Sequence, residues 1–318
     1  MKNKIDDNYD PIKSLQLFGL NNYFDEFIRR YENNNFPKVL LLTGDKGIGK
    51  FTFVFHLINY FLSKNNKSLY NLKEKIINKD SDIYKQLVSN VSENYVYIQN
   101  ENTSKATIDQ IREIKKKINN STLNNMPRFI IFDDVELLNL NSANSLLKVI
   151  EEPTDTNFFI LINNKRSKLI ETIKSRSIEF RFFLNILTKN EIFSKLSELN
   201  ILNVNFSHNF LKFTTPGLLL KFSKIISDNN FNENTGFYEI VSISLEKYKK
   251  TKNELFLNFI NFFLEIKFEK IILNKDNNLL NSVLEKKNIM KLLYNYKKFN
   301  LTNNSVLSFI KDTNNYHA

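Results

Sequence analysis

Runs of consecutive apolar residues alternate with helix-periodic segments through the first half of the chain. Four runs of four or five residues are typical of strands that a parallel sheet buries on both faces. One intervening segment, 107–114, opens with a capping box formed by Thr107 and Gln110, and its isoleucines recur at every third position. We therefore predict an α/β domain with a parallel sheet over residues 1–183. The four apolar runs are 39–42, 95–98, 129–132 and 158–162.

From Thr188 onward the pattern contains helices only, and a Thr-Thr-Pro-Gly break at 214–217 interrupts them. The segment 255–264 is apolar on more than one face, which is typical of a helix buried in a bundle or in an oligomer interface. We predict a small helical domain over residues 184–228 and a C-terminal helical oligomerisation domain over residues 229–318.

The composition is that of a globular protein of two or three domains, with 318 residues of which 42% are hydrophobic. The chain has no cysteine, which excludes disulfides, thiolate zinc sites and cysteine nucleophiles and fits a reducing compartment. The first residues lack the apolar core of a signal peptide, and no stretch approaches the ~20 apolar residues of a membrane span. We expect a cytoplasmic protein with no membrane partner.

The formal net charge is +11, which can raise the local concentration of phosphate groups and give non-specific affinity for nucleic acid. Most of the excess is lysine scattered among asparagine and isoleucine. This scatter favours compositional drift over a dedicated DNA-binding face, and both interpretations stay open.

A glycine-rich loop follows the first apolar run. Its spacing is glycine, four residues, glycine and lysine, in which backbone N–H groups surround phosphates and the lysine neutralises them. The segment after the loop has the pattern of a helix, so its N-terminus would face a bound anion. The alternative is a glycine turn that only lets strand and helix pack closely. The candidate phosphate-binding residues are Gly44, Gly47, Gly49 and Lys50.

One position of the loop departs from the phosphate-binding pattern. The residue after Lys50 should be serine or threonine to ligate Mg²⁺, and here it is Phe51. Thr52 is the nearest hydroxyl and is a candidate contact, but it lies about 100° farther round the helix and cannot simply replace that ligand.

A second candidate element delivers carboxylates to the edge of the predicted sheet where α/β proteins bind ligands. Asp133 directly follows the run 129–132 and is the candidate carboxylate for Mg²⁺. A hydrolysing site usually has glutamate as its general base at the next position, and Asp134 is one methylene shorter. The alternative is a polar strand end without chemistry.

Four stretches of the sequence together resemble the delta-prime subunits of bacterial DNA polymerase III clamp loaders, which are AAA+ proteins. The most specific stretch is 141–153, with its order of alanine-asparagine, leucine-leucine-lysine and glutamate-glutamate-proline. The resemblance covers residues 15–183 well and the remainder by domain order only. It implies a P-loop AAA+ domain, then a helical lid domain and a helical collar domain. The other stretches are 17–19 with 36–44, 132–134 and 175–177.

The resemblance assigns a role to Arg176. In the family, a Ser-Arg-Cys motif presents an arginine finger to the ATP of a neighbouring subunit, and 175–177 is similar to it with serine in place of cysteine. An arginine supplied in trans is worth roughly 10³–10⁵ in rate where it has been measured for GTPases. The alternative is a surface arginine that precedes a strand at 178–182.

The resemblance also locates the two sensor positions of the family. Asn163 and Asn164 end the fourth apolar run, where the sensor-1 polar residue lies, and the alternative is an ordinary polar strand end. The sensor-2 arginine is replaced by Leu218, and Lys221 falls outside the matching position. Many family members bind zinc through four cysteines, which this chain does not have.

The resemblance and the three altered positions, Phe51, Asp134 and Leu218, together predict a delta-prime subunit with a degenerate ATP site of its own. We expect ATP to bind weakly or not at all, Mg²⁺ to bind only with ATP, and no zinc. Such a stator would donate Arg176 to an adjacent ATPase and assemble with delta and gamma/tau subunits to load the sliding clamp on primed DNA. It would work in the bacterial cytosol, close to the nucleoid.

Two alternatives belong to other functional classes. The first is an active clamp-loader ATPase of the gamma/tau type, or another P-loop ATPase, which would hydrolyse ATP itself. The second is a nucleic-acid-binding adaptor without nucleotide chemistry, which rests on the charge of +11 alone.

Overall fold

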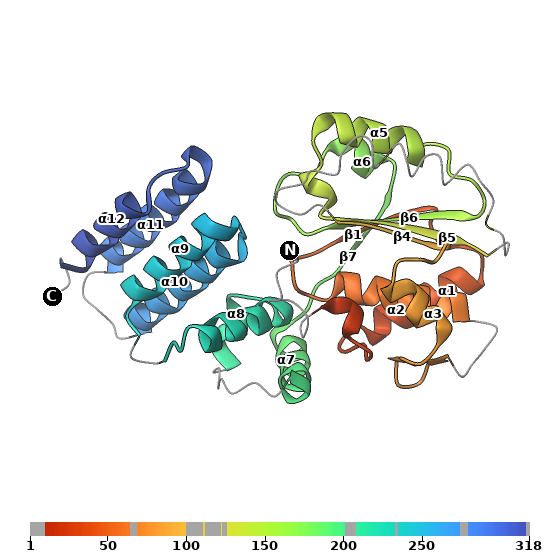
Figure 1. The fold of residues 1–318 in the computed structure, drawn as a ribbon, viewed down its shortest axis with the longest axis horizontal. Helices are drawn as coiled ribbons and strands as arrows, with labels where there is room; N and C mark the ends of the chain where they lie inside the picture. Colours follow the sequence, from red (N-terminus) through yellow and green to blue (C-terminus); the bar gives the residue numbers. More distant parts are fainter. Residues whose placement is uncertain are drawn as a thin grey trace. The chain divides into compact units, whose positions relative to one another are not determined.

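The computed structural model describes residues 10–63, 69–99, 111, 122, 126–200, 208–232, 235–273 and 279–315. In this part of the chain, five parallel strands form one sheet in the order β4-β5-β6-β1-β7 (Figure 1). The predicted parallel α/β architecture is confirmed, and all four apolar runs are strands of this sheet. The predicted helix at 107–114 falls outside the described residues, apart from Ile111. The strands are β1 (Val39–Thr43), β4 (Tyr95–Gln99), β5 (Arg128–Asp133), β6 (Asn157–Asn163) and β7 (Ile178–Arg181).

Helices cover both faces of the sheet, which explains why its strands are apolar at successive positions (Figure 1). In β1, Leu40 and Leu42 belong to the core on one face, whereas Val39 and Leu41 belong to the core on the other. One face is covered by α1 (Asn21–Glu32), α2 (Lys50–Ser63) and α3 (Asp82–Val88), and the opposite face by α5 (Leu140–Ile150) and α6 (Glu171–Ser175).

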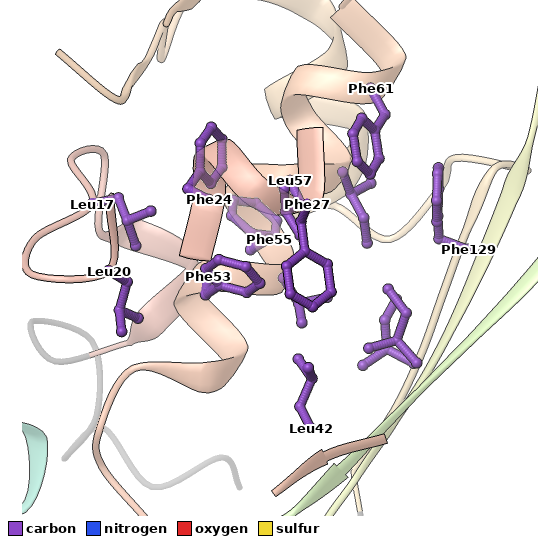
Figure 2. Packing of buried hydrophobic residues seen from close by; sticks show 14 of the residues in the cluster. Leu17, Leu20, Phe24, Phe27, Leu42, Phe53, Phe55, Leu57, Phe61 and Phe129 are labelled. Carbon is purple, nitrogen blue, oxygen red and sulfur yellow. The ribbon is translucent and has the colours of Figure 1, made fainter. Parts of the chain in front are cut away.

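Phenylalanine rings dominate the core between α1, α2 and the sheet (Figure 2). The rings of Phe27 and Phe53 meet edge to face with centroids 5.4 Å apart, and Phe24 lies against Phe53 at 6.1 Å. All three side chains are fully buried. Edge-to-face pairs of this kind add to the stabilisation from buried area. The packing fixes α2 on the sheet and thereby fixes the loop at its N-terminus.

The second half of the described chain is helical, as predicted. Two compact units can be distinguished, one of residues 1–201 with 215–220 and the other of residues 202–214 with 221–318. In the second unit, α9 packs against α10 and α12, and α11 packs against α10 and α12. The boundary between a lid and a collar domain at residue 228 stays a prediction. These helices are α7 (Ile186–Asn200), α8 (Pro216–Asp228), α9 (Phe237–Thr251), α10 (Leu255–Leu273), α11 (Leu279–Phe299) and α12 (Asn303–Asn315).

No helix in the described part of the chain has the length and apolarity to cross a membrane. Several short elements complete this part of the chain. The short elements are the 3₁₀ helices η1 (Pro11–Lys13), η2 (Val135–Leu137) and η3 (His208–Lys212), and the antiparallel pair β2 (Tyr70–Asn71) and β3 (Ile76–Ile77).

A buried histidine joins α2 to the segments around it. His56 is fully buried, with Nε2 2.9 Å from the carbonyl oxygen of Ser14 and Nδ1 3.1 Å from the hydroxyl of Tyr70. Since a carbonyl oxygen only accepts, Nε2 carries the proton and Nδ1 accepts from the tyrosine. Burial lowers the pKa of His56 to about 4, so the ring is neutral at neutral pH.

This low pKa predicts acid sensitivity of the fold. Between the unfolded pKa of 6.5 and the folded pKa of about 4, the unfolded chain binds the proton and the folded chain does not, so stability falls as the pH drops through that window. From pH 7 to pH 5, we expect His56 to account for a loss of about 2 kcal/mol in the free energy of unfolding. Urea unfolding at the two pH values, on wild type and His56→Gln, measures this loss. The same pH dependence in both proteins would contradict the assignment.

Candidate functional site

The glycine loop connects β1 to α2, in the predicted context of strand, loop and helix. Gly47 and Gly49 have φ angles of +85° and +92°, in the left-handed region where side chains are strained. At Gly44, a Cβ atom would lie 2.9 Å from the carbonyl oxygen of Phe182. The three glycines therefore have backbone reasons for being glycine. These reasons are compatible with both a phosphate cradle and a tight packing turn.

Lys50, the first residue of α2, folds back onto its own loop. Its Nζ donates to the carbonyl oxygens of Gly44 at 2.6 Å and Asp45 at 2.8 Å, and only 3% of the residue is exposed. Burial lowers the pKa of Lys50 to about 8, against the opposing effect of nearby carboxylates, chiefly Asp133. The ammonium group is thus satisfied by backbone oxygens and is protonated at neutral pH.

Asp133 ends β5, and both of its carboxylate oxygens accept hydrogen bonds from the protein. The hydroxyl of Tyr97 donates to Oδ2 at 3.2 Å, and Nδ2 of Asn164 donates to Oδ1 at 2.9 Å. The backbone N–H of Asp134 also donates to Oδ1, at 2.9 Å. Burial is the main cause that raises the pKa of Asp133, and the charge of Asp134 adds to it. Oδ1 thus accepts two hydrogen bonds and Oδ2 one, so the carboxylate is largely used by groups of the protein itself.

Aromatic rings lie where the phosphate-loop pattern expects a metal-binding hydroxyl. The ring of Phe51 is 4.5 Å from the ring of Tyr97, measured between centroids, so these two residues pack together beside Asp133. Thr52 is half buried in α2, and in the part of the chain that the structure describes its side chain makes no hydrogen bond.

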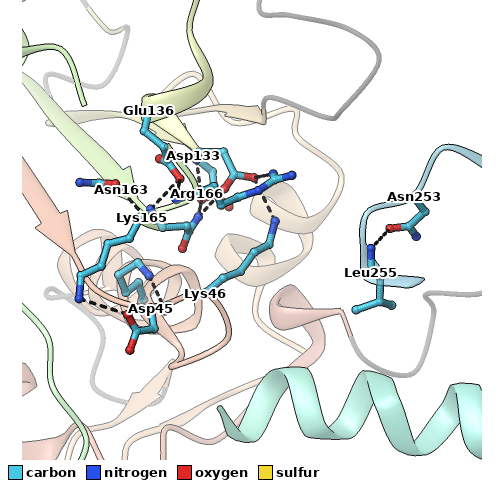
Figure 3. A network of polar contacts seen from close by, with 12 residues as sticks. Asp45, Lys46, Asp133, Glu136, Asn163, Lys165, Arg166, Asn253 and Leu255 are labelled. Carbon is cyan, nitrogen blue, oxygen red and sulfur yellow. Dashed lines mark hydrogen bonds and ion pairs between the residues drawn. The ribbon is translucent and has the colours of Figure 1, made fainter. Parts of the chain in front are cut away.

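Asp134 is the centre of a charge network that includes Lys46 and Arg166, both labelled in Figure 3. Asp134 is 2% exposed, and its Oδ2 lies 3.1 Å from both Lys46 Nζ and Arg166 Nη1. Oδ1 accepts a hydrogen bond from Asn164 at 2.8 Å. A second ion pair, Lys165 to Asp45, is more than half exposed on both sides and contributes about 0–1 kcal/mol. The pairs to the buried Asp134 carboxylate, with Arg166 14% and Lys46 38% exposed, are therefore better shielded from solvent than this surface pair.

The two candidate sensor-1 residues occupy different places. Asn164 donates to both aspartates and is the one that lies between them. Asn163 instead accepts from the backbone N–H of Lys165 at 2.9 Å, and its carbonyl oxygen accepts from the N–H of Gly44. Asn163 thus shapes the turn after β6 and the start of the glycine loop.

Four site residues were not predicted from the sequence: Lys46, Tyr97, Glu136 and Arg166. Glu136 is buried, and its Oε1 accepts from the backbone N–H groups of Asn164 and Arg166, which holds the turn after β6. Burial raises the pKa of Glu136. The available signals were a lysine inside the glycine loop, a tyrosine near the carboxyl end of a strand, and a lysine-arginine pair after another strand.

The start of α8 is fixed to the glycine loop by two hydrogen bonds, both accepted by carbonyl oxygens of the loop. Thr215 Oγ1 donates to the carbonyl oxygen of Lys46 at 2.7 Å. The backbone N–H of Gly217 donates to the carbonyl oxygen of Gly47 at 3.0 Å. A Cβ atom on Gly47 would lie 2.4 Å from Thr215 Oγ1, and one on Gly217 would lie 2.8 Å from the Gly47 oxygen. Leu218, which the resemblance predicts to replace the sensor-2 arginine, directly follows these contacts. Two close-packed glycines thus let helix and loop touch.

Arg176 lies at the C-terminal end of α6, and its side-chain partners belong to α5 and α6. Its Nε is 2.9 Å from Oε1 of Glu151, Nη1 donates to the carbonyl oxygen of Thr172, and 39% of the side chain is exposed. Among the described residues, the glycine loop makes no hydrogen bond to it. Arg176 is thus a surface cation.

Comparison with known proteins places this geometry in a family. The family model described as DNA polymerase III, delta subunit, matches residues 19–184, which include the glycine loop, both aspartates and Arg176. The chain is 26% identical over 287 residues to DNA polymerase III subunit delta' of Buchnera aphidicola subsp. Schizaphis graminum, which covers 79% of this chain and 85% of that relative.

Two further relatives differ in how much they match. Subunit delta' of Buchnera aphidicola subsp. Acyrthosiphon pisum is 24% identical over 294 residues, covering 86% of this chain and 83% of the relative. DNA polymerase III subunit gamma of the same organism is 30% identical over 161 residues, covering 51% of this chain and 42% of the relative. Similarity to the delta' proteins therefore extends over most of the chain, and similarity to this gamma protein over about half.

The close approach of Gly217 to Gly47 predicts a steric cost. We expect Gly217→Ala to lower the free energy of unfolding by about 1–3 kcal/mol, because the new methyl group would overlap the Gly47 carbonyl and force the loop and helix apart. Gly236→Ala is the control, because a Cβ atom there meets nothing within 4 Å, and we expect a change within about 0.5 kcal/mol. Urea unfolding of both variants measures the difference, and equal stability of Gly217→Ala and wild type would refute the proposed packing.

Proposed function

The chain belongs to the delta-prime family of DNA polymerase III clamp-loader subunits, and on this premise we propose that it serves as a stator. A stator keeps one conformation while neighbouring subunits bind and hydrolyse ATP. We propose further that its own nucleotide site is degenerate and that its chemical contribution is Arg176, which acts on the ATP of an adjacent subunit.

The observation that carries the proposal is the state of the two carboxylates. Asp133 accepts from Tyr97 and Asn164, and Asp134 is paired with two cations, so protein groups satisfy both aspartates. Metal-assisted hydrolysis needs a carboxylate and a hydroxyl on the ion, and a base that can orient water. With Phe51 in the hydroxyl position, the residues here do not fit a bound Mg²⁺, and we derive no hydrolytic step at this site.

A fixed connection between loop and helix supports the stator role. In AAA+ motors the phosphates of the nucleotide interact with the glycine loop. Here Lys50 binds the loop carbonyls of Gly44 and Asp45, and Thr215 and Gly217 bind those of Lys46 and Gly47. These contacts restrain the loop through its carbonyl oxygens, independently of the N–H groups that would face phosphates.

The exposure of Arg176 supports its role in trans. A guanidinium is always charged and presents a planar set of donors that matches phosphate oxygens. The side chain of Arg176 combines 39% exposure with a defined orientation on α6, so it is accessible to a partner subunit. In such a pair, the arginine would stabilise charge that develops on the transferred phosphoryl group.

Assembly with other clamp-loader subunits follows from the family, and we propose that the helical second half contributes to it. Large apolar side chains are exposed at intervals along α11, where Leu280 is 81% and Tyr294 63% exposed. Several exposed apolar side chains on one helix are typical of protein interfaces. We propose delta and gamma/tau subunits as the partners, with the sliding clamp and primed DNA as the substrates of the assembled loader.

We expect Arg176→Ala to abolish hydrolysis at one neighbouring ATP site, because an arginine supplied in trans contributes roughly 10³–10⁵ in rate. The measurement is single-turnover ATP hydrolysis by the reconstituted clamp-loader complex. Loss of one site should lower the amplitude of the fast phase, because the ATP bound at that site is no longer hydrolysed rapidly. The control is Arg181→Ala, since Arg181 is 72% exposed and pairs only with the nearby Glu179 in the described part of the chain. Wild-type hydrolysis by the Arg176→Ala complex would remove the arginine-finger assignment.

A further inference from the structure

Arg176 is held by two acceptors, one from each of the helices that pack together beneath it. Its Nε lies 2.9 Å from Oε1 of Glu151, and its Nη1 donates to the carbonyl oxygen of Thr172 at 3.3 Å. Of the five N–H donors of a guanidinium, two are used in this way. The other donors, on Nη1 and Nη2, have no acceptor among the described residues, so the Nη edge is available to an external anion.

The position of Glu151 is fixed by the end of α5. Its backbone N–H donates to the carbonyl oxygen of Leu147 at 3.0 Å, and Pro153, two residues later, cannot continue the helix. The position of Arg176 is fixed in the same way at the end of α6, where its N–H donates to the carbonyl oxygen of Ile173 at 3.3 Å. Ile173 is fully buried in the same core as Leu147. The ion pair therefore joins the ends of two anchored helices.

The neighbouring glutamate shows that this contact is specific to one position. Glu152 is exposed like Glu151, and in the described chain it makes no hydrogen bond or ion pair. At the C-terminal end of a helix, a carboxylate meets the negative end of the helix dipole, which disfavours it unless a cation lies nearby. Arg176 supplies that cation to Glu151.

We propose that Glu151 is a positioning residue for Arg176, an inference that rests on the proposed role of Arg176 as an arginine finger. By holding Nε, the Glu151 carboxylate orients the guanidinium so that its Nη edge faces the nucleotide phosphates of the adjoining subunit. A long side chain that is already oriented loses less conformational freedom when it binds. The phosphate can bind the free Nη donors while the contact to Glu151 stays intact, so the carboxylate does not compete with it.

The test is single-turnover ATP hydrolysis by the reconstituted clamp-loader complex that carries variants of this chain. We expect Glu151→Ala to slow hydrolysis at the site that Arg176 serves by about three- to five-fold, the upper range for an exposed ion pair, with the KM for ATP unchanged. Glu151→Gln keeps an acceptor oxygen and should retain a rate between those of Glu151→Ala and wild type. Glu152→Ala is the matched control and should hydrolyse ATP at the wild-type rate.

A second set of complexes separates positioning from a structural role. In an Arg176→Ala background, Glu151→Ala should leave hydrolysis at the remaining ATP sites of the complex unchanged, because a positioning residue acts only through the arginine. Slowing of those remaining sites by Glu151→Ala would show a structural role and overturn the inference. The inference would also be overturned if Arg176→Ala slowed hydrolysis while Glu151→Ala hydrolysed ATP at the wild-type rate or faster. Wild-type hydrolysis by Arg176→Ala itself would instead overturn the proposed function on which the inference rests.

Discussion

The structure of the glycine-loop region depends on one buried charge, the carboxylate of Asp134. It is 2% exposed and lies 3.1 Å from the cations of both Lys46 and Arg166. Arg166 is 14% exposed and Lys46 38%, so losing either cation leaves the carboxylate with one partner. Losing both would leave an uncompensated buried charge, which typically costs ~3–5 kcal/mol. Lys46 belongs to the glycine loop, Asp134 to the end of β5, and Arg166 to the turn after β6. One carboxylate thus holds together three segments that are far apart in sequence.

The consequences of this network extend to the start of α8. The loop residues Lys46 and Gly47 use their carbonyl oxygens to hold Thr215 and Gly217. A loop fixed on one side by the buried ion pairs therefore fixes the first turn of α8 on the other side. The stator role that we propose would use these contacts to keep the loop in one conformation. In the proposed function, the chemistry belongs to Arg176 on α6, whose contacts are separate from this network.

The sequence was informative where local pattern determines structure. Continuous apolar runs predict strands buried on both faces, and β1, β4, β5 and β6 were found at those positions because helices cover the sheet on each side. The loop glycines were predictable in the same way, since positive φ angles at Gly47 and Gly49 require them. The order of the family motifs also singles out Arg176, whose predicted role depends on a neighbouring subunit.

The partners within the site were not predictable, because they depend on which side chains from distant segments meet. Nothing local to Lys46 indicates that it pairs with Asp134, 88 residues away in sequence. The two adjacent candidates Asn163 and Asn164 could not be separated from the sequence, and they differ because neighbouring side chains at a strand end point in different directions. Only the folded chain shows that Asn164 bridges the aspartates whereas Asn163 supports the turn.

We infer that contacts within the protein hold the glycine loop whether or not a nucleotide is added, and amide hydrogen exchange of the loop tests this inference. The measurement compares the exchange rates of residues 44–50 and 215–220 in the isolated chain with and without millimolar Mg²⁺ and ATP. We expect the same rates in both conditions, because Asp134, Lys46 and Arg166 already hold the loop. Slower exchange of both segments on addition of Mg²⁺ and ATP, and its loss in Lys50→Ala, would show instead that a bound nucleotide holds the loop.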